Sequence, residues 1–205
     1  MPVFLGTYAN SATNREHKFT RAVKSFLTNT YKNKLLIIVS DGCDKARDVY
    51  NKEFAECKEI MFMMLKKQPQ WSGSVRQAGI NLANKIGKPN DVICYLDSDD
   101  MLIETHIENI HNGFNRNPLI HWVYFNDYLR KNKDTVDLRQ VALMPCMIGT
   151  SAIAHLNKPE YNWNDCNGYG HDWKFIEKLI SSKQEYSKIY GAGYLCCHVP
   201  NYYES

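Results

Sequence analysis

The chain has 205 residues, of which 44% are hydrophobic and 23% are charged, as in globular proteins with one sizeable core. Its net charge of +3 is too small for this length to favour nucleic acid as the main partner. The sequence has no run of the roughly 20 apolar residues that a membrane helix needs, and its first residues do not form a secretory signal. We therefore expect a soluble protein without a transmembrane segment.

The chain contains seven cysteines, and none of them forms a C-x-x-C pair. Cys196 and Cys197 are neighbours, and adjacent cysteines seldom bridge because the geometry is strained. We expect reduced thiols and a cytoplasmic, reducing compartment.

Short apolar runs alternate with amphipathic segments over the first half of the chain. The runs have the length of strands and lie at 3–5, 35–39, 60–65 and 92–96. Between them, apolar residues recur at helical spacing over 19–27, 45–54 and 75–86. This order, with short links, predicts an α/β fold with a mostly parallel central sheet flanked by helices.

After Asp100 the pattern loosens. We expect helices over 103–114 and 171–180, and strands over 122–128, 185–189 and 194–197. The stretch 134–153 shows no pattern that can be assigned, and 158–170 is irregular. No repeat, low-complexity tract or linker interrupts the chain, so one domain over 1–205 is the simplest organisation.

The run at 92–96 ends in Asp97, Ser98, Asp99 and Asp100. Three carboxylates in four residues repel one another unless a cation or water offsets their charge. One interpretation is an acidic turn that caps the next helix. The other is a ligand and metal site, because open α/β sheets bind ligands at the carboxyl ends of their strands.

Two other predicted strands also end in polar residues, which favours the second interpretation. Thr7 and Tyr8 follow the first strand, while Asp41 and Asp44 follow the second. No Gly-rich phosphate loop follows the first strand, which argues against P-loop nucleotidases and dinucleotide oxidoreductases. A diphosphate bound here would need Mg²⁺ or Mn²⁺ and a side chain such as Arg76 to meet its charge.

Several motifs occur in a definite order along the chain. They are Thr7-Tyr8-Ala9-Asn10, Ser25-Phe26-Leu27 with Thr30-Tyr31, Val39-Ser40-Asp41-Gly42-Cys43-Asp44, Gly73-x-x-Arg76-Gln77-x-Gly79, Tyr95-Leu96-Asp97-Ser98-Asp99-Asp100 and Gly170-His171-Asp172-Trp173. This series resembles the family 2 glycosyltransferases of the GT-A fold. Two positions depart from the family pattern: Ser40 replaces an Asp, and His171 replaces a Glu. The resemblance implies one GT-A domain with a nucleotide-binding half over about 1–100 and an acceptor-binding half over about 101–205.

The resemblance also implies roles in binding a sugar nucleotide. Asp99 would bind the metal, and Asp97 would accept from ribose or sugar hydroxyls, with Ser98 beside it. We expect Asp100 to cap the following helix instead. Arg76 would pair with the diphosphate or with Asp97.

The nucleobase of the donor would be recognised at the ends of the first two predicted strands. Asp41 would accept from the N3–H of uracil, although the replacement at Ser40 leaves open which residue makes this contact. Thr7 and Tyr8 would border the base, where Tyr8 either stacks on it or packs in the core.

Asp172 would be the catalytic base, which takes the proton of an acceptor hydroxyl during an in-line displacement with inversion. It could also cap the helix that follows it. His171 could orient the acceptor or face solvent, and His198 could complete the metal shell or be incidental. Trp173, with the aromatic residues Tyr161, Trp163 and Tyr169, could face a sugar or simply pack.

The resemblance thus implies an inverting, metal-dependent enzyme that moves a sugar from a UDP-sugar to a glycan or glycoprotein hydroxyl. Two alternatives stay open: a nucleotidyltransferase that makes the sugar nucleotide, and a non-catalytic module that binds sugar nucleotides or glycans. The C-terminal segment is also compatible with family members from large algal viruses, which would place the protein in a virus-infected cell.

Overall fold

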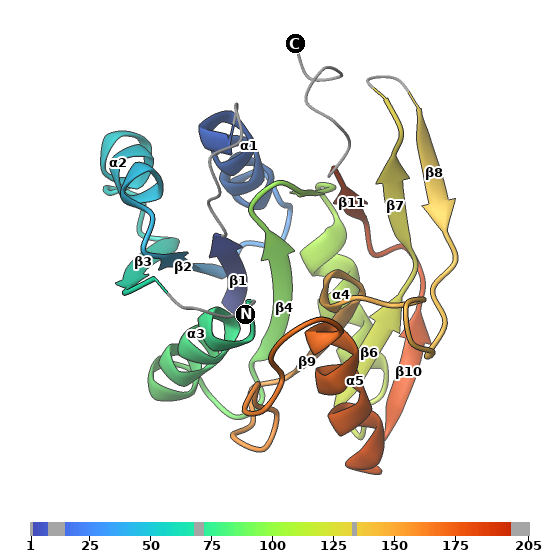
Figure 1. Cartoon of the computed structure of the whole chain (residues 1–205). Coiled ribbons are helices and arrows are strands. Elements are labelled where there is room, and N and C mark those ends of the chain that lie inside the picture. The colour runs from blue at the N-terminus through green and yellow to red at the C-terminus, as the bar shows by residue number, and fades with distance from the viewer. Residues whose placement is uncertain (1, 8–14, 68–71, 133–134, 198–205) are drawn as a thin grey trace.

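The computed structural model describes residues 2–7, 15–67, 72–132 and 135–197. A seven-stranded sheet in the order β10-β6-β9-β4-β1-β2-β3 runs through the centre of the molecule (Figure 1). Its strands are β1 (Pro2–Thr7), β2 (Leu35–Asp41), β3 (Ile60–Leu65), β4 (Val92–Asp97), β6 (Trp122–Phe125), β9 (Ile153–Leu156) and β10 (Tyr186–Ile189). The part β4-β1-β2-β3 is parallel throughout, as the alternating pattern predicted. Strand β9 runs antiparallel to both β4 and β6, so the whole sheet is mixed.

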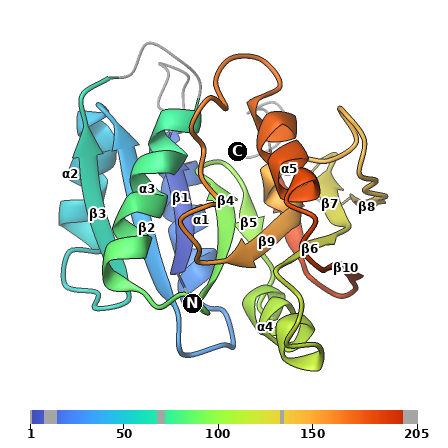
Figure 2. The ribbon, with the colours of Figure 1, turned by 90° about the horizontal axis from the view of Figure 1, so that it is seen from below.

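Helices cover both faces of this sheet. They are α1 (Arg15–Leu27), α2 (Asp44–Glu53), α3 (Gly73–Ile86), α4 (His106–Arg116) and α5 (His171–Ser181), with a 3₁₀ turn η1 at Thr150–Ala152. Helices α3 and α5 lie on one face, and α1 and α2 lie on the other (Figure 2). The N-terminal ends of α3 and α5 therefore lie on the same face of the main sheet. None of the helices in the described ranges combines the length and the apolar character that crossing a bilayer requires.

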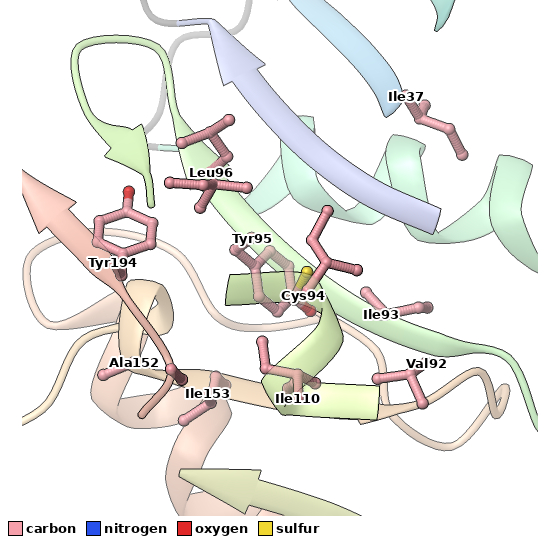
Figure 3. Close-up of a cluster of buried hydrophobic side chains, with 14 of the residues drawn as sticks. Ile37, Val92, Ile93, Cys94, Tyr95, Leu96, Ile110, Ala152, Ile153 and Tyr194 are labelled. Atoms are coloured by element: carbon pink, nitrogen blue, oxygen red, sulfur yellow. The ribbon is translucent and has the colours of Figure 1, made fainter. Parts of the chain in front are cut away.

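Strand β4 forms the middle of the hydrophobic core. The side chains over 92–96 are at most 5% exposed, because other residues cover both faces of the strand. Figure 3 shows them among Ile37 of β2, Ile110 of α4, Ile153 of β9 and Tyr194. Burial on both faces explains why the sequence here is a continuous apolar run rather than an alternating one.

A smaller sheet in the order β5-β11-β7-β8 lies beside the first. Its strands are β5 (Met101–Leu102), β7 (Asp127–Arg130), β8 (Val136–Arg139) and β11 (Tyr194–Cys196). The single strand expected over 122–128 is therefore wrong: the chain breaks at Asn126 and enters the second sheet. The Asn126 side chain accepts from the backbone N–H of Val141 at 3.0 Å and donates to Gln140 at 2.8 Å, so it holds this switch point.

Candidate active site

The carboxyl ends of β1, β2 and β4 meet at one edge of the main sheet. In the strand register, Thr7 lies beside Ser40, and Gly6 lies beside Asp97. The sequence-predicted positions Thr7, Asp41 and Asp97 therefore share this edge. The side chain of Thr7 and the whole of Tyr8 lie outside the described part of the structure.

Arg76 joins this edge to helix α5. Its Nη2 donates to Asp97 Oδ1 at 3.0 Å, and its Nη1 donates to Asp172 Oδ1 at 2.6 Å. The guanidinium side chain is only 5% exposed, whereas the side chain of Asp97 is 42% exposed. A buried cation thus connects a strand-end carboxylate, open to solvent, with a carboxylate from a distant part of the sequence.

Aromatic rings hold the Arg76 side chain in place. Its guanidinium carbon lies 4.9 Å from the centroid of the Trp163 ring and 6.0 Å from that of Tyr95. Trp163 stacks on Phe175 with 4.2 Å between centroids, and its Nε1 donates to the Tyr95 hydroxyl at 3.1 Å. The Tyr95 hydroxyl in turn bonds His155 Nε2 at 2.7 Å. This packing leaves the guanidinium few orientations other than the one that faces the two carboxylates.

The position of Arg76 also depends on how closely α3 approaches the loop before α5. Arg76 lies in the first turn of α3, three residues after Gly73. A Cβ at Gly73 would stand 2.2 Å from the carbonyl oxygen of Cys166, which no real side chain tolerates. The bare glycine therefore lets the loop that carries Trp163 lie directly against the start of α3.

Asp172 lies in the first turn of α5 and does not cap it. The residue that caps the helix is Gly170, with φ of 77°, and no side chain bonds the helix end there. The Asp172 carboxylate instead points at α3, and its Oδ1 also accepts from Thr150 Oγ1 at 2.8 Å. The Asp172 carboxylate therefore belongs to the hydrogen-bonded group that Arg76 forms with Asp97.

Charge and burial act in opposite directions on the pKa values of Asp172 and Arg76. Burial would raise the pKa of Asp172, but Arg76, His171 and Thr150 outweigh it and hold that pKa well below its ordinary value. Burial would lower the pKa of Arg76, but Asp172 and Asp97 outweigh it and raise that pKa. The pair is therefore ionised throughout the neutral range.

His171 contacts the same carboxylate rather than facing solvent. Its Nδ1 lies 3.1 Å from the carbonyl oxygen of Gly168 and can only donate to it, so Nδ1 carries a hydrogen. Its Nε2 lies 2.9 Å from Ser72 Oγ and 3.1 Å from Asp172 Oδ1. A neutral ring accepts from Ser72, while a doubly protonated ring donates to Asp172.

Residues 97–100 make contacts in two directions. Asp97 faces the open edge of the main sheet, whereas Asp100 bonds to the segment that contains β11 of the smaller sheet. Ser98 and Asp99 form the turn after β4 and are half-buried. Asp100 is buried, and it accepts from the Tyr194 hydroxyl at 2.7 Å and from the backbone N–H of Cys197 at 2.6 Å. Burial, reinforced by Asp97 and Asp99, raises the pKa of Asp100 to about 8.

The expectation that Asp100 caps the next helix is wrong. Strand β5 follows it directly, and the helix after that, α4, begins only at His106, with Thr105 at its cap position. The buried carboxylate instead fastens the acidic turn to β11, since its two oxygens accept from groups at the two ends of the segment 194–197.

In the turn after β4, Asp99 is the carboxylate that the sequence predicts as a metal ligand, and Asp97 is the one that it predicts for donor hydroxyls. Within the described ranges, no group of three or more His, Cys, Asp or Glu side chains is close enough to enclose a metal ion. Asp97 keeps Oδ2 available, because Arg76 occupies Oδ1. A carboxylate such as that of Asp99, on a half-buried turn, suits Mg²⁺ or Mn²⁺, whose other positions water and phosphate oxygens would fill. His198 lies outside the described residues.

Asp41 and Ser40 have different environments. Ser40 Oγ accepts from the N–H of Cys43 at 3.1 Å and lies 3.2 Å from its carbonyl oxygen, so this side chain stabilises the turn. Asp41 is fully buried and accepts from Lys67 Nζ at 3.0 Å. Asp44 begins α2 and pairs with Arg47 at 2.9 Å on the surface. Of the three polar residues in this turn, Asp41 is therefore the one with a carboxylate at the sheet edge.

The aromatic residues near Asp172 serve different purposes. Tyr161 and Trp163 are buried and pack in the core, while Trp173 is partly buried and packs against it. Tyr169 is 86% exposed. Sequence reasoning missed two contacts, the stacking of Trp163 on Arg76 and the Thr150 hydrogen bond. Thr150 lies in the unassigned stretch 134–153, and no local signal links it to Asp172.

Comparisons with known proteins agree with this architecture. The sequence profile described as "Glycosyl transferase family 2" matches residues 11–180. Among curated proteins, the glycosyltransferase GlyA of Streptococcus pneumoniae serotype 4 is 26% identical over 98 residues, which cover 48% of this chain and 13% of that protein.

Solved structures of S. aureus TarS share the fold. TarS 1–349 in complex with UDP-GlcNAc has a TM-score of 0.73 at 13% identity, covering 95% of this chain and 57% of that one. The complex of TarS 1–349 with UDP has a TM-score of 0.69, covering 95% and 59%. The chain therefore spans less than two thirds of these relatives, and the expected GT-A fold is confirmed. The match of the family profile to most of its length shows that the chain belongs to glycosyl transferase family 2.

Proposed function

We propose that this chain transfers a sugar from a UDP-sugar to an acceptor hydroxyl with inversion, using Asp172 as the base. The observation that carries the proposal is the Arg76 bridge between Asp97 and Asp172. It places the strand-end carboxylate and the carboxylate at the start of α5 on one guanidinium. Membership of the family and the likeness to TarS structures with UDP-GlcNAc and UDP support the choice of donor.

The donor would lie along the edge formed by β1, β2 and β4. Asp41 would accept from the uracil N3–H, and the free Oδ2 of Asp97 would accept from donor hydroxyls. The Arg76 guanidinium, which is always charged, would attract the diphosphate to the point where the two carboxylates converge. Asp99 would hold Mn²⁺ or Mg²⁺, which when bound offsets the negative charge of the diphosphate.

In the chemical step, the acceptor oxygen forms a bond to the anomeric carbon as the bond from that carbon to the diphosphate oxygen breaks. The acceptor proton passes to the Asp172 carboxylate, and the electron pair of the broken bond leaves with UDP. The low pKa of Asp172 makes it a weak base while Arg76 bonds it. A diphosphate that shares the charge of Arg76 would strengthen that base at the moment it is needed.

The first test is Asp172→Asn. We expect UDP release from a UDP-sugar to fall by about 10²–10⁴-fold, while UDP binds within about twofold of the wild type. Asp165→Asn is the matched control, because Asp165 is exposed on the loop before α5 and its φ of 65° suits Asn. Unchanged turnover in Asp172→Asn would refute the base assignment. UDP binding without any turnover in the wild type would instead indicate a binding module.

The second test is Asp99→Ala, measured by calorimetric titration of UDP with and without Mn²⁺. We expect the gain in UDP affinity that Mn²⁺ gives the wild type to disappear in the variant. GDP and CMP serve as competing nucleotides in the same titrations. An equal gain from Mn²⁺ in both proteins would remove Asp99 as the metal ligand.

A further inference from the structure

The two oxygens of the Asp172 carboxylate have different surroundings. Oδ1 accepts from Arg76 Nη1 at 2.6 Å and from Thr150 Oγ1 at 2.8 Å, and it lies 3.1 Å from His171 Nε2. No described residue donates to Oδ2. Three groups from three parts of the chain therefore converge on one oxygen and leave the other uncommitted.

The space beside Oδ2 is bounded by Gly149. A Cβ built on this glycine would stand 3.4 Å from Asp172 Oδ2 and 3.6 Å from Ser151 Oγ, and both are ordinary contact distances. The φ of Gly149 is −121°, which any residue adopts. The backbone here does not require glycine, so the missing side chain leaves room beside Oδ2 without serving the fold.

We propose that Oδ2 is the oxygen that receives the acceptor proton, that Thr150 is a positioning residue that fixes the carboxylate through Oδ1, and that Gly149 admits the acceptor. This inference rests on the proposed function. A carboxylate held by one oxygen keeps its other oxygen in a fixed direction, which is the condition for efficient proton transfer. The acceptor oxygen then bonds to the anomeric carbon, its proton goes to Oδ2, and the leaving electron pair stays on UDP.

The position of the two residues explains how the site is connected. Gly149 caps the 3₁₀ turn η1, which begins at Thr150 and leads into β9, the strand that pairs antiparallel with β4. Strand β4 ends at Asp97, and Arg76 bonds both Asp97 and Asp172. The hydroxyl that orients the base thus lies in the turn that leads into β9, and the carboxylate that faces the donor lies at the end of β4, the strand paired with β9.

Thr150→Val tests the positioning role, because valine keeps the shape of threonine and removes the donor. We expect turnover of UDP-GlcNAc, UDP-glucose or UDP-galactose, whichever the wild type consumes fastest, to fall about 10- to 100-fold with UDP affinity within about twofold. Thr150→Ser should restore most of the rate. Loss of a donor to the carboxylate should also move the acidic limb of the pH–rate profile to higher pH. Thr28→Val is the matched control, since the Thr28 hydroxyl donates to the Ser25 carbonyl oxygen at the end of α1.

Gly149→Ala tests the acceptor path with two acceptors of different size. We expect transfer to glycerol to fall about tenfold or more, while transfer to water changes by less than about threefold, because an added methyl group obstructs the larger molecule. UDP affinity should not change. Equal effects on both acceptors would overturn the role of Gly149.

The outcomes separate this inference from the function on which it rests. A wild type that binds UDP and consumes a UDP-sugar, beside a Thr150→Val variant with the same rate and pH profile, would refute the inference and leave the function standing. Parallel loss of UDP binding and turnover in that variant would show a merely structural role. A wild type that neither binds UDP nor consumes a UDP-sugar would refute both.

Discussion

Arg76 bonds two carboxylates that come from distant parts of the sequence, and it does so from a nearly closed aromatic environment. Removing a buried cation from such a position leaves both carboxylates without their partner. The planar fork of arginine matters as much as its charge, because each of its two terminal nitrogens reaches a different acid.

Arg76→Lys keeps the charge and removes the fork. We expect turnover and UDP affinity both to fall by about tenfold or more, because an ammonium group can hold one carboxylate but not align two. Kinetics and UDP titration measure the two effects. Arg47→Lys is the control, since Arg47 lies half-exposed on α2 in a surface pair with Asp44. Wild-type behaviour of Arg76→Lys would mean that the bridge has no part in donor binding or catalysis.

At the scale of elements, the site depends on how closely α3 and the loop before α5 approach each other. Gly73 contacts Cys166 in this loop, and the backbone N–H of Trp163 donates to Gln77 Oε1 at 2.5 Å. Both contacts fix the loop against α3. The loop in turn carries the ring that covers Arg76.

Gly73→Ala should therefore separate the helix from the loop. We expect the free energy of unfolding to fall by about 1–3 kcal/mol, although alanine is otherwise the better helix former. Urea denaturation measures this change, and Lys85→Ala on the exposed part of α3 is the control. An unchanged or increased free energy of unfolding in Gly73→Ala would show that the loop can move away from α3 without destabilising the protein.

The sequence predicted the first half of the fold well because each of its elements is locally consistent. The runs at 35–39, 60–65 and 92–96 became β2, β3 and β4, and the segment 75–86 became most of α3. These inferences needed only periodicity and the rule that parallel strands end at one edge. The contact of Arg76 with Asp97 was one of the two alternatives that the family resemblance implied for this side chain, the other being the diphosphate.

The second half needed information that periodicity does not contain. One apolar run, 122–128, serves two sheets, because Asp127 is buried beside Arg139 in the smaller sheet. The antiparallel insertion of β9 between β4 and β6 brings Thr150 close to Asp172. No pattern within either segment of the sequence indicates that these two residues meet. The contacts proposed for Tyr8 and His198 remain predictions, since both lie outside the described residues.

At the scale of the whole molecule, two histidines are enclosed in the core in their neutral form. Burial lowers the pKa of His106 to about 3 and that of His155 to about 4. The His155 ring bonds Tyr95 and the carbonyl oxygen of Leu156, whereas neither ring nitrogen of His106 has a hydrogen-bond partner among the described residues. Unfolding would release both rings to water, where their pKa values return to about 6.5.

This predicts acid sensitivity with a definite sign. Above about pH 6.5 both states are neutral and the stability is fully present. As the pH falls towards 4, the unfolded state takes up protons that the folded state cannot. Each histidine then lowers the free energy of unfolding by about 1.4 kcal/mol per pH unit.

His106→Leu isolates one of these contributions and also removes two unsatisfied polar atoms. We expect it to raise the free energy of unfolding at pH 7 by about 1 kcal/mol. Its advantage over the wild type should grow by about a further 2 kcal/mol between pH 7 and pH 5. Urea denaturation at the two pH values measures both differences, and a constant difference would refute the titration of His106.

The fastening of Asp100 to the segment 194–197 has a consequence for the order in which the protein assembles. The Tyr194 hydroxyl also accepts from the backbone N–H of Asp97, so the turn that carries Asp97 and Asp99 takes its shape partly from a strand made near the end of the described chain. On the ribosome, the earlier strands can pair as they emerge. The acidic turn takes its final shape only after Cys197 has left the exit tunnel, so a nascent chain cut short before that residue would have the sheet but not the ordered turn at its edge.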